Sequence, residues 1–70
     1  MRWIPAKSEA IKAYAYNVVE RKLRVRFKSG RVYDYDDVDP RTFAEYVTAD
    51  SQGAYLNQKI KPGRAYHQVH

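Results

Sequence analysis

The sequence predicts a small α+β domain: an antiparallel three-stranded meander with one helix and a short second helical segment packed on one face. Three observations favour this class. The 70 residues suit one domain, residues 1–70, and cannot hold two independent cores. Apolar and polar residues alternate in two stretches between residues 22 and 38, which indicates strands. An acid followed by proline at positions 39–40 indicates the start of a helix.

The first strand is expected over residues 11–16, where small and aromatic side chains alternate. This alternation assigns the residues to two sides of the strand, with Ile11, Ala13 and Ala15 opposite Tyr14 and Tyr16. Residues 17–21 then connect to residues 22–28, the clearest strand of the chain. There Leu23, Val25 and Phe27 alternate with basic residues, the pattern of a half-buried strand.

Two hairpin registers are possible for the strand that follows, at residues 31–38. A two-residue loop at Ser29–Gly30 would expose an Arg/Tyr platform of the kind that stacks bases, but it would place Asp34 and Asp36 on the apolar face. A three-residue loop at 28–30 matches apolar with apolar and basic with acidic residues, in the pairs Val25–Tyr33, Leu23–Tyr35, Arg24–Asp34 and Lys22–Asp36. Because burying two carboxylates is costly, we favour the three-residue loop.

Two helical segments are expected after the hairpin. Asp39 is suited to cap a helix with proline at its first position, and this helix should end near residues 49–50. Ser51 is a second candidate cap, for a short segment that Pro62–Gly63 ends. The tail, residues 65–70, fits either a short strand or coil. The predicted core takes apolar side chains from each of these elements: Ile11, Leu23, Val25, Phe27, Tyr33, Tyr35, Phe43, Val47, Leu56 and Ile60.

Charge is unevenly distributed along the chain, whose formal net charge is +5. Residues 1–31 carry nine Lys and Arg against two acids, a net of +7. Residues 32–50 carry one Arg against six acids, a net of −5, and residues 51–70 carry three basic residues and no acid, a net of +3. A basic excess suits polyanions such as nucleic acid, although the acidic middle of the chain neutralises part of it.

Catalytic and metal chemistry have no support in the sequence. The acidic run at 34–39 lacks the glycine and closing glutamate of a calcium loop, and His67 and His70 lack a third ligand. No serine has an evident base beside it, and no cofactor motif is present. We expect a non-catalytic protein without metal or cofactor. The lack of cysteine, of a signal peptide and of an apolar run of roughly 20 residues predicts a cytoplasmic protein that does not engage membranes.

The stretch from residue 51 to residue 66 carries the strongest functional signal. It combines a capped helix start, a glycine, basic residues without acidic neighbours and two tyrosines. Helix N-terminal amides and basic side chains both bind phosphate. Packing explains the same pattern slightly better: Tyr55, Leu56, Ile60 and Tyr66 would cover the sheet, and the lysines would be solvated. A similar choice holds for residues 3–5, which either anchor a partner or, as we favour, fold over a sheet edge or the helix face.

An ordered set of short motifs runs through most of the chain: Ser8, Ile11, Tyr16-Asn17, Leu23-x-Val25-x-Phe27, Gly30, Tyr33-x-Tyr35, Val38-Asp39-Pro40, Ser51-x-Gly53-x-Tyr55-x-Asn57-x-x-Ile60 and Tyr66. This set resembles the KTSC domain, named for the C-terminal extension of some lysyl-tRNA synthetases and also found as small bacterial and phage proteins. Ala15 and Asn17 depart from the family pattern, which commonly has glycine and an acid there. The resemblance implies a small α+β domain without known catalytic activity and, by its attachment to a synthetase, a role near RNA.

Two functions remain open. The first is a non-catalytic nucleic-acid-binding module, for RNA above all. Its candidate residues are Lys59, Lys61 and Arg64 for phosphates, Tyr66 for stacking, Asn57 for hydrogen bonding, and Lys28 and Arg31 at the hairpin tip. The second is a protein-interaction module, of phage origin, that uses Trp3 and exposed tyrosines on an open sheet edge. The sequence leaves the oligomeric state undetermined.

Overall fold

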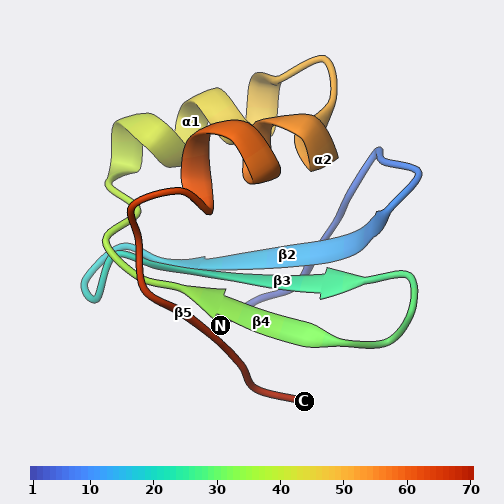
Figure 1. Cartoon of the computed structure of the whole chain (residues 1–70), viewed down its shortest axis with the longest axis horizontal. Coiled ribbons are helices and arrows are strands. Elements are labelled where there is room, and N and C mark those ends of the chain that lie inside the picture. The colour runs from blue at the N-terminus through green and yellow to red at the C-terminus, as the bar shows by residue number, and fades with distance from the viewer.

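The computed structural model describes residues 1–70 as a five-stranded antiparallel sheet with all helical segments on one face (Figure 1). The strands lie in chain order: β1 (Ile4–Pro5), β2 (Ile11–Asn17), β3 (Lys22–Phe27), β4 (Val32–Tyr35) and β5 (Tyr66–Gln68). The helical segments are α1 (Pro40–Thr48), α2 (Gln52–Tyr55) and a π-helical turn, η1 (Leu56–Ile60). The α+β class is therefore confirmed, while the expected three strands are only the centre of a five-stranded sheet.

The two additional strands are short and lie at the edges of the sheet. β1 pairs with β2, so the segment around Trp3 covers one edge of the meander. β5 pairs with β4, so the tail that the sequence left undecided includes a strand. Neither strand has an apolar alternation that would have revealed it; backbone pairing with a preformed edge holds both in place.

The hairpin between β3 and β4 has the three-residue loop that the charge pattern favoured. Val25 lies opposite Tyr33 and Arg24 opposite Asp34, as expected. The Phe27 amide donates to the Arg31 carbonyl at 2.9 Å, which leaves residues 28–30 as the loop. Gly30 has a φ of 97°, a conformation that a residue with a side chain rarely adopts.

The facing of β2 is a correction. The pairing of β2 with β3 shifts register between Ile11 and Ala13, where a bulge interrupts the strand. Because one extra residue reverses the alternation, Ile11 shares the helix-covered face with Tyr14 and Tyr16 rather than with Ala13. Tyr14 thereby joins the core, with 4% of its surface exposed.

Both predicted helix starts are confirmed. The Asp39 side chain accepts a hydrogen bond from the Thr42 amide at 2.8 Å, and Pro40 is the first helical residue. The Ser51 hydroxyl accepts one from the Ala54 amide at 3.2 Å. These capped starts turn the chain twice, so that α1, α2 and η1 all pack against the same side of the sheet (Figure 1).

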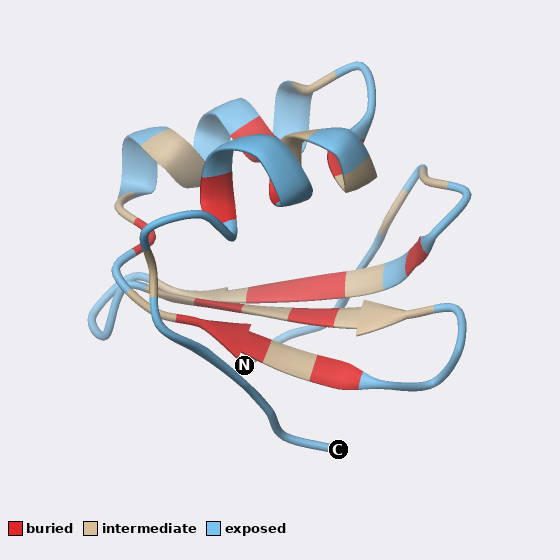
Figure 2. Cartoon of the chain, viewed as in Figure 1, coloured by how far each residue is buried: buried red, intermediate tan, exposed pale blue.

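The core lies between that side of the sheet and the helices, where Figure 2 shows the buried positions of both layers. Six predicted core residues are buried: Ile11, Leu23, Val25, Tyr35, Leu56 and Ile60. Phe27, Tyr33 and Phe43 are half-buried, and Val47 is a correction because 37% of it is exposed. Sequence reasoning left five buried apolar residues out of the core: Tyr14, Ala15, Val32, Val38 and Tyr46.

Candidate functional site

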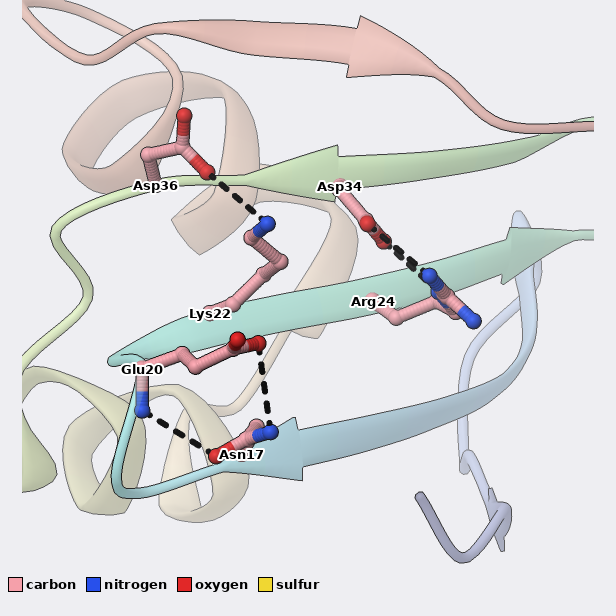
Figure 3. A network of polar contacts seen from close by, with 6 residues as sticks. All are labelled: Asn17, Glu20, Lys22, Arg24, Asp34 and Asp36. Atoms are coloured by element: carbon pink, nitrogen blue, oxygen red, sulfur yellow. Dashed lines mark hydrogen bonds and ion pairs between the residues drawn. The ribbon is translucent and has the colours of Figure 1, made fainter.

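Basic side chains lie on both faces of the sheet, and their surroundings differ. We call the five charged residues on the helix-free face, Lys22, Arg24, Arg26, Asp34 and Asp36, the bare-face ladder. Arg24 donates from Nε and Nη2 to the two carboxylate oxygens of Asp34, at 2.7 and 3.0 Å (Figure 3). Lys22 Nζ lies 3.9 Å from Asp36, and the Arg26 guanidinium lies 4.7 Å from the centre of the Trp3 ring. Each cation of the ladder thus has a partner within the protein.

Asp34 shows that the ladder is structural. It is 3% exposed although no helix covers this face, and the hydrogen bonds from Arg24 hold the pKa of its carboxyl below the usual range despite burial. A buried carboxylate is stable only with such a partner. The sequence pairing of basic with acidic residues therefore describes a stabilising contact rather than a ligand site.

The hairpin tip on the helix side lies beside a hollow of about 580 Å³, which we call the basic–aromatic hollow. Its lining includes four aromatic residues, Phe27, Tyr33, Tyr35 and Tyr66. Three cations, Lys28, Arg31 and Lys61, and the amide side chain of Asn57 are also part of it, together with Ala10 and Ser29. No acid lines the hollow. Five of the seven candidate binding residues, distant in sequence, thus meet at one place.

The aromatic rings of the hollow form a connected group. Tyr66 lies nearly parallel to Tyr35, with ring centres 5.6 Å apart, and 6.3 Å from Tyr33. Phe27 meets Tyr33 edge-on at 5.9 Å. Tyr66 is 42% exposed, whereas Tyr35 is buried beneath it, so the rings descend from the surface to the core. Burial raises the pKa of Tyr35 to about 12, so its hydroxyl is neutral across the physiological range.

The cations of the hollow have no acidic partner. Neither of the two ion pairs in the structure involves Lys28, Arg31 or Lys61, and all three are exposed. Lys61 Nζ lies 5.2 Å from the centre of the Tyr66 ring, which holds a charge beside a flat surface. The hollow therefore offers exposed positive charge next to aromatic rings.

The other two candidate residues lie differently. Arg64 donates from Nε to the Asp37 carbonyl at 3.0 Å and from Nη1 to the carbonyls of Lys59 and Ile60, at 2.8 and 3.1 Å. It thereby satisfies the carbonyls at the end of η1 and ties them to the loop before α1, which is a positioning role. Lys59 is exposed but does not line the hollow. Sequence reasoning missed five lining residues: the small residues Ala10 and Ser29, and the aromatic residues Phe27, Tyr33 and Tyr35, which it assigned to the core alone.

A second hollow of about 500 Å³ borders the first and shares Ala10 and Asn57 with it. It contains one cation, Lys7, and two acids, Glu9 and Asp50, and no aromatic residue. The charged residues that line it sum to a negative net charge, whereas those of the basic–aromatic hollow sum to a positive one. Nowhere does the chain bring together three side chains of the metal-binding types. Neither helix has the length and apolar character needed to cross a bilayer.

Comparison with known proteins gives a consistent family. The model of the KTSC domain matches residues 7–66. A protein of Tsukamurella paurometabola is 38% identical over 58 residues, covering 83% of this chain and 87% of its own. An uncharacterized protein of Stutzerimonas stutzeri is 32% identical over 62 residues, covering 89% and 87%. The crystal structure of a KTSC domain protein from Yersinia pestis superimposes with a TM-score of 0.91 at 23% identity, covering 99% of this chain and 97% of that one.

Proposed function

The chain belongs to the KTSC domain family, and from that premise we propose that it is a non-catalytic module that binds single-stranded nucleic acid, RNA in the first instance, in the basic–aromatic hollow. The single observation that carries the proposal is the composition of that hollow: four aromatic residues beside three exposed cations that form no ion pair, with no acid. Proteins that bind single strands combine these two elements, because every base has a flat face and every linkage has a charged phosphate.

The geometry favours a single strand over a duplex. Tyr66, the most exposed ring, lies among partly and fully buried rings rather than on a flat outer surface. A base inside a duplex is stacked on both faces and cannot enter such a recess, whereas an unpaired base can. Lys28, Arg31 and Lys61 at the border of the hollow are then placed to contact the phosphates on either side.

A protein-interaction module is the weaker alternative. It required an open sheet edge, and β1 and β5 pair with both edges of the central meander. It also required a free Trp3, whose ring faces the Arg26 guanidinium. The two outer strands are short, two and three residues, which limits strand addition by a partner.

The test is equilibrium binding of a fluorescent single-stranded RNA to the protein and to two variants. K28Q/R31Q/K61Q removes the three cations of the hollow, and we expect roughly 100-fold weaker binding at low salt. K7Q/K12Q/K59Q removes the same net charge at exposed positions outside the hollow, and we expect only a few-fold loss. Arg64 is left intact because its hydrogen bonds hold the backbone.

Matched DNA and duplex arms complete the experiment. Single-stranded DNA of equal length tests whether the ribose hydroxyl contributes to binding. A duplex tests whether a base must be unpaired to enter the hollow. Equal losses in the two variants would show that net charge alone drives binding and would overturn the assignment to the hollow. The absence of binding to every strand would remove nucleic acid from the function of this protein.

A further inference from the structure

Tyr35 contributes an unusual polar group to the basic–aromatic hollow. It is 3% exposed and lies in β4 beneath the rings of Tyr33 and Tyr66. Its hydroxyl makes no hydrogen bond within the protein, in contrast to that of Tyr33, which donates to Gln68 Oε1 at 3.4 Å. A buried hydroxyl without a partner costs folding free energy, so the position needs an explanation.

The Tyr35 hydroxyl is not sealed in the core. The fully enclosed polar atoms without a partner are Tyr46 Oη and Gln52 Oε1, and the Tyr35 hydroxyl is not among them. Among the three hollows of the molecule, Tyr35 lines the basic–aromatic hollow alone. Because Tyr35 lines no other hollow, we infer that its hydroxyl is reached through the basic–aromatic hollow, beside the exposed ring of Tyr66.

The chemistry of the site separates an inner part from an outer part. The cations that suit phosphates are exposed, whereas the unpartnered group of the inner part is the buried phenol of Tyr35, which is neutral at physiological pH. A neutral hydroxyl both donates and accepts, so a nucleobase edge, which carries donors and acceptors, can use both capacities, whereas a phosphate linkage offers acceptors alone. Asn57, exposed in the same hollow, adds an amide with the same two capacities.

We propose that the Tyr35 hydroxyl is a specificity-determining contact that hydrogen-bonds the polar edge of one unpaired nucleobase stacked in the hollow. This inference rests on the proposed function and adds to it the group of the ligand that is recognised, the polar edge of a base. The hollow then recognises a base together with its flanking phosphates. An abasic strand should therefore bind more weakly than a base-containing strand of the same charge.

The test uses Tyr35→Phe, which removes only the oxygen, and two fluorescent single strands of equal length and charge, one with bases and one abasic. We expect Y35F to bind the base-containing strand about 5- to 10-fold more weakly, the loss of one hydrogen bond, and to bind the abasic strand as the unchanged protein does. Tyr46→Phe is the matched control, since its hydroxyl is also buried without a partner but lines none of the three hollows. It should leave the ratio between the two strands unchanged.

The outcomes separate the inference from the proposed function. If the unchanged protein binds the base-containing strand and Y35F binds it equally well, the role of Tyr35 is overturned while binding stands. Equal losses on both strands would also overturn it, because they would mark a general structural effect. If the unchanged protein binds neither strand, the proposed function and the inference built on it are both overturned. Thermal unfolding of Y35F should occur at the same temperature as that of the unchanged protein or at a higher one, because no native hydrogen bond is lost and a buried hydroxyl without a partner is removed.

Discussion

The two faces of the sheet use the same residue types for different ends. On the helix-free face, Arg26 lies over Trp3, and on the helix side, Lys61 lies beside Tyr66, at 4.7 and 5.2 Å. The helix-free face also holds Asp34 and Asp36, which pair with its other cations. The basic–aromatic hollow holds no acid. The comparison teaches that a cation next to an aromatic ring indicates a ligand site only where no carboxylate already neutralises the surroundings.

The largest expected effect follows from removing the ion pair between Arg24 and Asp34 on the helix-free face. Arg24→Met leaves Asp34 buried without a partner, and we expect a loss of about 2–3 kcal/mol in the free energy of unfolding. The loss stays below that of a fully enclosed pair because a third of the Arg24 side chain is exposed. Urea denaturation measures it. The double variant R24M/D34L should recover most of the stability, and a failure to recover would show that the ion pair is not the cause.

The second prediction compares Tyr66, which lines the basic–aromatic hollow, with Trp3 on the helix-free face. Tyr66→Ala should weaken binding of single-stranded RNA about 10-fold or more, since stacking of one base contributes roughly 1–3 kcal/mol. Trp3→Ala removes an aromatic ring of the other face and should leave the dissociation constant unchanged. Fluorescence anisotropy at one salt concentration measures both. A larger effect of W3A than of Y66A would move the binding site to the helix-free face.

The third prediction concerns acid and Asp34. The pKa of this carboxyl is lowered in the folded protein, so its contribution to stability is full above the unfolded pKa of about 3.9 and is lost as the pH falls through the lower, folded value. The free energy of unfolding should therefore fall more steeply below about pH 4 in the unchanged protein than in R24M/D34L. Parallel curves for the two proteins would contradict the coupling between Arg24 and Asp34.

The smallest expected effect concerns the salt dependence of RNA binding to the basic–aromatic hollow. Single strands lose affinity with salt at a slope of about −0.7 per phosphate contacted, so three cations predict a slope of about −2. Lys61→Gln should reduce the slope by about 0.7, while Lys22→Gln, whose charge already pairs with Asp36, should leave it unchanged. Equal changes in both variants would show that the two faces do not differ in this respect.

The sequence predicted a structural feature correctly where the alternative would cost much free energy or where a strong local signal marks the feature. The β3–β4 register followed from the cost of burying Asp34 and Asp36 on the apolar face, and the helix starts followed from Asp39–Pro40 and Ser51. The bulge between Ile11 and Ala13 could not be predicted, because small and aromatic residues alternate there in either facing. The edge strands could not be predicted either, since backbone pairing leaves no side-chain pattern.

The kinds of residue that form the candidate site could be predicted from the sequence, but not the complete set of residues that line it. Lys28, Arg31, Asn57, Lys61 and Tyr66 were identified as exposed polar or aromatic residues, and the fold brings them together. Arg64 has the same appearance in sequence, but its partners are backbone carbonyls, which no residue pattern reveals. Tyr33 and Tyr35 were assigned to the core because strand alternation shows which face a residue occupies, not whether that face is hollowed.

The most direct test of the central claim is an amide chemical-shift titration of the labelled protein with a single-stranded RNA at low and moderate salt. The account predicts salt-sensitive shifts at the hairpin tip, at Asn57 to Lys61 and at Tyr66, with Lys22, Arg24 and Arg26 unmoved. Shifts centred on the bare-face ladder would contradict the assignment of the hollow. A spectrum unchanged by RNA would contradict nucleic-acid binding itself.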